Sequence, residues 1–254
     1  MSHPGRLEGK VAIVTGGGLG LGEGIVRKFI FEGAKVLLFE INEKGGAKVA
    51  DSLGESASLF VGDVTKEDDW NAAVKQALDK FGKLHIVVNN AGVVHNAQAS
   101  YTVPIEEYER IMKINVSPLY HSAKAVHPVF KKAGGGVFVN ISSISAPRPR
   151  PNLVWYAGSK GAVSAVSKGL AAEFGKDGIR VNAICPVAAD TGMMRSVLGG
   201  TDSEEGRAVV IKAIPLGRVA NAQDVGNAAA WLASDEASFI TGIELPVDGG
   251  RALQ

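Results

Sequence analysis

The sequence predicts an α/β protein built on a doubly wound, parallel sheet of about seven strands with helices on both faces. Three observations predict this fold. Short apolar runs alternate with longer helical patterns along the chain. The runs are apolar almost throughout, as strands covered by helices on both faces are. The first run leads directly into a glycine-rich turn, TGGGLGLG.

The predicted elements follow one another in a regular order. The strand-like runs are 11–15, 35–39, 58–62, 85–89, 136–141, 180–184 and 243–247. Helical patterns occupy 23–33, 68–82, 105–132, 156–175 and about 222–234. Strand, helix and strand in succession build right-handed βαβ units, and hence a parallel sheet. No linker, repeat or low-complexity segment divides the 254 residues, so we expect one domain over 1–254.

The composition excludes several classes of protein. Hydrophobic residues make up 46% and charged residues 21%, and the net charge is +1, so nothing favours a nucleic-acid or membrane partner. A single cysteine, Cys185, rules out an internal disulfide. The start, MSHPGRLEGK, lacks the apolar core of a secretory signal, and no apolar run is long enough to span a bilayer. We expect a soluble cytoplasmic protein. The histidines show no metal-ligand spacing.

The glycine-rich turn carries Gly16, Gly20 and Gly22 between the first strand and the first helix. Glycines let the backbone approach a pyrophosphate closely. The helix that follows presents free N–H groups and the positive end of its dipole to the anion. This context predicts a Rossmann-type dinucleotide site, and a purely structural turn is the alternative.

The next acidic residue bears on the choice of dinucleotide. Glu40 ends the second strand, 24 positions after Gly16. A carboxylate there hydrogen-bonds the hydroxyls of an adenosine ribose and repels a 2′-phosphate, which favours NAD over NADP. The loop carries Leu19 rather than a basic residue, and Lys35 and Lys44 are the nearest residues that would hold a 2′-phosphate.

A second group of polar residues predicts acid–base chemistry. Tyr156 and Lys160 are four residues apart, on one face of a helix. The ammonium and an oxidised nicotinamide would lower the phenol pKa, and a shift of about 3 units takes about 4 kcal/mol. The phenol would then act as a general acid/base. Ser143, at a strand end, would polarise the reacting oxygen, and Asn115 would relay hydrogen bonds through water toward Lys160.

Together and in this order, these motifs resemble the short-chain dehydrogenase/reductase family over nearly the whole chain. TGGGLGLG resembles its T-G-x-x-x-G-x-G cofactor loop, and NNAG and Y-x-x-x-K fall at family-like separations. The resemblance implies that Tyr156 is the general acid/base, Lys160 its activator, Ser143 the ligand of the substrate oxygen and Asn115 part of a proton relay. The residues that it implies for cofactor binding are Gly16, Leu19, Gly20, Leu21, Gly22, Glu40, Asp63, Val64, Asn90, Ala91, Gly92, Tyr156, Lys160, Pro186, Ala189 and Thr191.

The chain departs from the family pattern after the sixth strand. In CPVAADTGMM, Val187 stands where the family commonly has glycine. A branched residue rarely takes positive φ, so we expect a different turn at the pocket floor. The following segment, about 191–215, is rich in glycine and contains Met193 and Met194. By resemblance it is the substrate loop, and an ordinary surface excursion is the alternative.

Four residues are candidates for the substrate pocket: His95, Arg150, Trp155 and Met193. Arg148 and Arg150 stand among three prolines between Ser143 and Tyr156. A guanidinium at the pocket rim binds a carboxylate, phosphate or sulfonate. Contact with solvent or with another subunit is the alternative for the arginines, and a surface or packing role is the alternative for His95 and Trp155.

We therefore expect an NAD-dependent oxidoreductase that interconverts a secondary alcohol, sugars and polyols among them, with its ketone by direct hydride transfer. One alternative is an NADPH-dependent ketoreductase, such as a 3-oxoacyl-thioester reductase. A non-catalytic nucleotide-binding protein is another, although the intact catalytic set argues against it. By resemblance, segment 105–132 and the helix from 156 pair subunits into a homotetramer.

Overall fold

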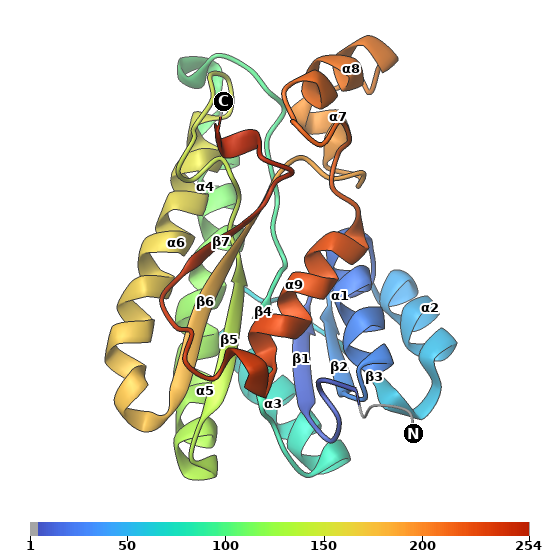
Figure 1. Ribbon diagram of the computed structural model, residues 1–254, viewed down its shortest axis with the longest axis vertical. Coiled ribbons are helices and arrows are strands. Elements are labelled where there is room, and N and C mark those ends of the chain that lie inside the picture. Colours follow the sequence, from blue (N-terminus) through green and yellow to red (C-terminus); the bar gives the residue numbers. More distant parts are fainter. Residues whose placement is uncertain (1–4, 254) are drawn as a thin grey trace.

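The computed structural model describes residues 5–253. Residues 1–4 and 254, which the single-domain prediction includes, lie outside the described residues. One parallel sheet has the strand order β3-β2-β1-β4-β5-β6-β7 (Figure 1), which confirms the predicted doubly wound fold. Its strands are β1 (Val11–Thr15), β2 (Lys35–Glu40), β3 (Ala57–Val61), β4 (Ile86–Asn89), β5 (Gly136–Ile141), β6 (Ile179–Pro186) and β7 (Glu244–Val247).

Helices cover both faces of this sheet (Figure 1). One face carries α1 (Gly20–Phe31), α2 (Glu43–Leu53) and α9 (Ala222–Ala233). The other face carries α3 (Glu67–Phe81), α5 (Ser117–Ala133) and α6 (Val154–Phe174). Helix α4 (Ile105–Asn115) packs on α5 and α6. The short helices α7 (Met194–Val197) and α8 (Glu204–Lys212) lie beyond one end of the sheet (Figure 1).

Alternate residues of each central strand enter different cores. On β1, Ala12 and Val14 pack under α1 and α9, whereas Ile13 packs with the opposite helical layer. On β2, Leu38 joins the first core, and Leu37 joins the second. Successive side chains of a strand point to opposite faces, so each apolar run supplies both cores at once.

The helical segment predicted over 105–132 is two helices. Helix α4 ends at Asn115 and α5 begins at Ser117, with Val116 between them at φ −113° and ψ −48°. Pro118 lies in the first turn of α5, where its missing N–H costs no intrahelical hydrogen bond. In one continuous helix, the Pro118 ring would clash with the carbonyl group of Ile114, four residues earlier, and the break at Val116 relieves this clash. The break places Asn115 at the end of α4.

Three further helices fall where the sequence predicts none. Helix α2 occupies EKGGAKVADSL despite its two glycines, because Asn42 caps its first turn and Val49 and Ala50 are buried. Helices α7 and α8 lie inside the predicted substrate loop, and the Ser203 side chain caps α8.

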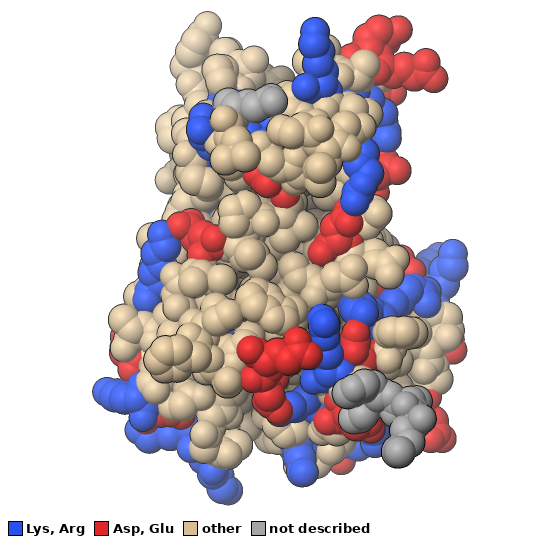
Figure 2. Space-filling view, viewed as in Figure 1, with Lys and Arg blue, Asp and Glu red and all other residues tan. Residues whose placement is uncertain are grey.

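The surface carries both signs of charge. Figure 2 shows lysine and arginine side chains interspersed with aspartate and glutamate over one face of the molecule. Within residues 5–253, no helix combines the length and apolar character that crossing a membrane requires. The same part of the chain contains no group of three or more His, Cys, Asp or Glu side chains that could hold a metal ion.

Candidate active site

A cavity of about 690 Å³ lies at the carboxyl ends of the strands. Residues that follow β1 to β6 line it, as does the segment that leads into α7. The cavity spans the point where the strand order reverses, between β1 and β4, which is where open α/β sheets bind ligands. All the residues predicted to bind the cofactor line it.

The glycine loop has a backbone that other residues would not allow. Gly16 and Gly20 have φ values of +64° and +58°. A Cβ atom at Gly22 would lie 1.9 Å from the carbonyl oxygen of Gly16, so a side chain there would push the loop apart. Helix α1 begins at Gly20, and its N-cap, Leu19, makes no side-chain capping bond. The first-turn N–H groups are therefore left for a ligand rather than a cap.

The end of β4 holds this loop in place. The Asn90 side chain donates to the carbonyl oxygens of Thr15 (2.9 Å) and Gly16 (3.2 Å). In return, the Thr15 hydroxyl accepts from the backbone N–H groups of Asn90 (2.9 Å) and Ala91 (3.0 Å). These reciprocal hydrogen bonds fix the glycine loop against the NNAG segment before any ligand binds. Thr15 is a positioning residue that the sequence did not single out.

Glu40 is buried at the end of β2, with its carboxylate beside the glycine loop. One oxygen, Oε2, accepts from Gly18 N (3.0 Å). The other, Oε1, accepts from the N–H groups of Ile41 and Asn42, each at 2.9 Å. A carboxylate offers about four acceptor positions, so three are filled and one remains for a ligand hydroxyl. Glu40 thus shapes the loop as well as lining the cavity.

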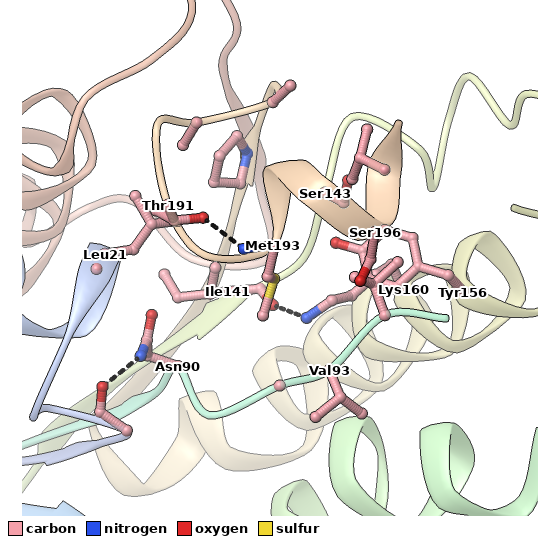
Figure 3. Close-up of a pocket in the computed structure, with 18 of the residues that line it drawn as sticks. Leu21, Asn90, Val93, Ile141, Ser143, Tyr156, Lys160, Thr191, Met193 and Ser196 are labelled. Carbon is pink, nitrogen blue, oxygen red and sulfur yellow. Dashed lines mark hydrogen bonds between the residues drawn. The ribbon is translucent and has the colours of Figure 1, made fainter. Parts of the chain in front are cut away.

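Ser143, Tyr156 and Lys160 meet at the other side of the cavity (Figure 3). Tyr156 and Lys160 project from the first turns of α6, and Ser143 follows β5. The Ser143 side chain lies close enough to the Tyr156 phenol to lower the pKa of that phenol. Lys160 Nζ donates to the carbonyl oxygen of Ile141 at 2.8 Å and lies 5.9 Å from the centre of the Tyr156 ring.

The pKa of Tyr156 departs from the expectation. Burial raises the pKa of the phenol, and the nearby Ser143 side chain offsets only part of this. Burial also lowers the pKa of Lys160 to about 8. The protein groups alone therefore do not lower the phenol pKa, and the lowering expected with a bound oxidised nicotinamide stays a prediction. Desolvation is the largest cause of both shifts, and the Lys160 ammonium is bound to the Ile141 carbonyl.

Asn115 acts on the backbone beside this group. Its Oδ1 accepts from Val93 N at 2.7 Å, and its Nδ2 donates to Val93 O and to the Ser159 hydroxyl, each at 2.9 Å. A Cβ atom at Gly92 would lie 3.2 Å from Asn115 Oδ1 and 3.3 Å from Lys160 Nζ. Asn115 therefore joins α4 to the loop segment that follows β4 and to α6, close to the end of the Lys160 side chain.

The pocket floor carries Val187 without backbone strain. Among residues 5–253, Asn152 is the one non-glycine residue with positive φ, so Val187 keeps a negative φ. Its side chain is buried in a small apolar cluster with Ile144, Ala189 and Ile214. The departure from the family pattern thus adds an apolar side chain to the lining of the cavity, and the expected difference in the turn stays a prediction.

The candidates for the substrate pocket divide into two pairs. Arg150 and Met193 line the cavity. His95 and Trp155 are absent from the described residues that line it, which corrects the prediction. The His95 ring is buried, with Nδ1 2.8 Å from Asn96 O. The Trp155 ring packs edge-on against Tyr108, and its Nε1 donates to Ser100 O at 2.9 Å.

Comparisons with known proteins agree with this geometry. A family model described as "Enoyl-(Acyl carrier protein) reductase" matches residues 17–252. The 4-formylbenzenesulfonate dehydrogenase of Comamonas testosteroni is 43% identical over 98% of this chain and 100% of its own length. The chain belongs to the short-chain dehydrogenase/reductase family. A 3-oxoacyl-[acyl-carrier-protein] reductase of Chlamydia muridarum is 38% identical over 97% of this chain and 98% of its own length.

A solved structure of the same family has the same fold. It is a 3-ketoacyl-(acyl-carrier-protein) reductase from Brucella melitensis, complexed with NADH. The identity is 42%, the TM-score is 0.92, and the match covers 97% of this chain and 99% of that chain.

Several cavity residues were not predicted. Arg251 follows β7, and Arg110 lies on α4. The apolar lining includes Val93, Ile144 and Val197. Arg251 was within reach of sequence reasoning, because the loops after all parallel strands gather at one edge of the sheet. Val93 and Ile144, which follow β4 and β5, were within reach for the same reason, whereas Arg110 and Val197 depend on how α4 and the α7–α8 segment fold over that edge.

Proposed function

We propose that the protein is an NAD-dependent oxidoreductase that interconverts a secondary alcohol and its ketone. One observation carries the proposal. The glycine loop with Glu40 and the group Ser143, Tyr156 and Lys160 line the same cavity. Relatives named as dehydrogenases and as ketoacyl reductases, and the NADH complex of the Brucella melitensis protein, support this class of reaction.

The residues present fit a nicotinamide dinucleotide. Gly16, Gly20 and Gly22 leave room where a Cβ would intrude, and the uncapped start of α1 faces the place for a pyrophosphate. The Thr191 methyl group lies 3.3 Å from the Cβ position of Gly20, so the segment after β6 closes against the glycine loop at the edge of the cavity that both line. Bound nicotinamide would supply hydride chemistry that no side chain can perform.

The side chains of the chain itself would handle the proton. During oxidation, Tyr156 as phenolate takes the hydroxyl proton of the alcohol while the carbon gives up hydride; during reduction, the neutral phenol returns the proton. The Ser143 hydroxyl lies beside the phenol in the same cavity, where it can bind the same substrate oxygen. The positive charge of Lys160 favours the phenolate and is retained below a pH of about 8.

Glu40 supports NAD over NADP. Its carboxylate is fixed by three backbone N–H groups and cannot turn away from a ligand without losing them. A 2′-phosphate beside this fixed carboxylate would be repelled by its like charge, and partial burial makes that repulsion stronger. The neighbouring Ile41, which is exposed and lines the cavity, offers no positive charge.

The second candidate is an NADPH-dependent 3-oxoacyl-thioester reductase. The names of the Chlamydia muridarum and Brucella melitensis proteins favour this substrate class, whereas Glu40 argues against NADPH. The apolar lining near Tyr156 favours a substrate with an apolar body over a sugar or polyol. A homotetramer remains a prediction from the family, and a cytoplasmic location remains a prediction from the sequence composition.

A panel of substrates tests the proposal. Secondary alcohols with NAD and NADP, and ketones with NADH and NADPH, are followed by nicotinamide absorbance. We expect turnover in both directions, with kcat/KM higher for NAD(H). Equal or better turnover with NADP(H) would refute the assignment of Glu40 and favour the second candidate. No turnover with any alcohol or ketone would refute the reaction class.

A further inference from the structure

The cavity carries opposite charges at its two ends. Its acidic lining residues are Glu40 and Asp63, which follow β2 and β3. Arg148, Arg150 and Arg251 line the part that follows β5 and β7, where none of the described lining residues is acidic. The ribose of a cofactor would lie at the acidic end, near Glu40. The basic end is therefore the part of the cavity that a substrate beside Tyr156 would reach.

Arg150 differs from Arg110, another arginine of the cavity, in its partners. Arg110, on α4, is paired with Glu107 through two hydrogen bonds, of 2.9 and 2.6 Å. Arg150 is half-buried, and its contact within residues 5–253 is one hydrogen bond, of 2.6 Å, to the carbonyl oxygen of Val197. A guanidinium has five N–H donors, so most of its hydrogen-bonding capacity is left over. No carboxylate of the described residues neutralises it.

An unneutralised charge in this position is costly. Burial lowers the pKa of Arg150, and the nearby charge of Arg251 lowers it further, which shows that the surroundings oppose the cation. Partial burial of a cation is ordinarily compensated by an anion with good hydrogen-bond geometry. An anionic ligand at the cavity would provide that compensation.

The loop around Arg150 holds it in place. Pro147, Pro149 and Pro151 restrict the backbone, and Asn152 takes a φ of +69°. Asn152 O accepts from Gln98 N at 3.0 Å, which ties the loop to the segment after β4. The bond to Val197 ties it to α7. Binding therefore costs little ordering of the loop.

The remaining wall is apolar. Val93, Ile144, Leu153, Met193, Val197 and Val210 line the cavity on the side of the catalytic group. A ligand that contacts both Arg150 and this apolar wall has an apolar body with one anionic oxygen group. Arginine binds two oxygens of a carboxylate or a sulfonate through paired hydrogen bonds.

We propose that Arg150 binds an ionised carboxylate or sulfonate of the substrate, so that the enzyme acts on alcohols and ketones whose apolar body carries this anion. The inference rests on the proposed function. It makes Arg150 a specificity-determining residue, separate from the group that moves the proton.

Matched substrates test this inference. Wild type, Arg150→Gln, Arg150→Lys and the control Arg195→Gln are compared on 4-acetylbenzoate and on neutral 4-methylacetophenone with NADH. Arg195 is exposed on α7 and bonds Gly200 O, so its substitution removes one nearby positive charge outside the cavity. We expect wild type to have a higher kcat/KM for the anionic ketone than for the neutral one. Arg150→Gln should lower the ratio of these two kcat/KM values by about 10- to 100-fold, as a lost charged hydrogen bond does. Arg150→Lys should recover part of the preference, and Arg195→Gln should keep it.

The outcomes separate the two proposals. The inference would be overturned if Arg150→Gln left the ratio of kcat/KM for the anionic ketone to that for the neutral ketone unchanged, or if Arg195→Gln lowered this ratio equally. Reduction of the neutral ketone would still uphold the proposed oxidoreductase activity in either case. Calorimetric titration of benzoate, with and without NADH, adds a readout that needs no turnover. Benzoate binding that disappears in Arg150→Gln would uphold the anion site even in an enzyme that reduces neither ketone, and equal binding to both proteins would refute it.

Discussion

The ammonium of Lys160 lies 5.9 Å from the centre of the Tyr156 ring, four residues earlier on the same helix. At this range the charge favours a phenolate without bonding to it directly. Burial opposes ionisation of both groups, raising one pKa and lowering the other. Burial therefore disfavours both the phenolate of Tyr156 and the ammonium of Lys160, and proton transfer at this site depends on both side chains.

Replacement of Tyr156 with phenylalanine removes the proton acceptor and preserves the ring. We expect kcat to fall by about 10²- to 10⁴-fold, the usual contribution of general acid–base catalysis. NADH affinity, measured by fluorescence titration, should change little, because the glycine loop and Glu40 are untouched. Normal turnover in this variant would rule out the assignment of the proton to Tyr156.

Replacement of Lys160 with methionine should change how stability depends on pH. The folded pKa is about 8, below the ordinary value of 10.5, so the unfolded chain binds more protons between these values. The cost of burying the ammonium, about 3 kcal/mol, is full below pH 8 and disappears as pH rises to 10.5. In urea unfolding, the free energy of unfolding of wild type should therefore rise by this amount between pH 8 and pH 10.5, relative to that of the variant. Parallel pH profiles for the two proteins would contradict the lowered pKa.

The double substitution Glu40→Ser with Ile41→Arg should shift the cofactor preference toward NADP. It removes the carboxylate and adds a cation at an exposed lining position. Three backbone donors lose their acceptor, so we also expect weaker NAD binding. The ratio of kcat/KM for the two cofactors measures the shift, and Ile41→Arg alone is the control. An unchanged ratio in the double variant would mean that the ribose is recognised elsewhere.

Gly22→Ala tests the tight packing of the cofactor loop. The new Cβ would lie 1.9 Å from Gly16 O and 2.5 Å from Asn90 Nδ2. We expect a loss of at least about 2 kcal/mol of unfolding free energy, together with loss of NADH binding. Gly175→Ala is the matched control, because a Cβ there meets nothing within 4 Å and φ is −55°. Equal thermal stability of the two variants would show that the loop gives way at little cost.

Much of the fold was predictable because burial on both faces of the sheet is visible in the sequence. The runs at Val11–Thr15 and Lys35–Glu40 are apolar at nearly every position, and the structure divides them between two cores. Helix α2 was not predicted, because its burial involves a narrow apolar face and two glycines. The break at Val116 was missed because Pro118 is compatible with the first turn of a helix as well as with its end.

The site was predictable where motifs fix the backbone, and unpredictable where loops meet. The glycine loop, Asn90 and the end of β5 are set by strand register, so Gly16, Ser143 and Tyr156 share one cavity. His95 and Trp155 follow such motifs by a few residues, yet turn toward Asn96 and Tyr108. Their direction depends on local hydrogen bonds and ring packing, which spacing along the chain does not specify.

The order of the strands has a consequence for how this enzyme can evolve. Glu40 ends β2 and Arg150 follows β5, and β1 and β4 lie between these strands, a separation of about 14 Å at about 4.8 Å per strand. Substitutions that far apart, with no shared partners, combine additively. A lineage can therefore change its dinucleotide by mutations around β2 and keep its substrate, or recruit a new substrate through the β5–α6 loop and keep its dinucleotide.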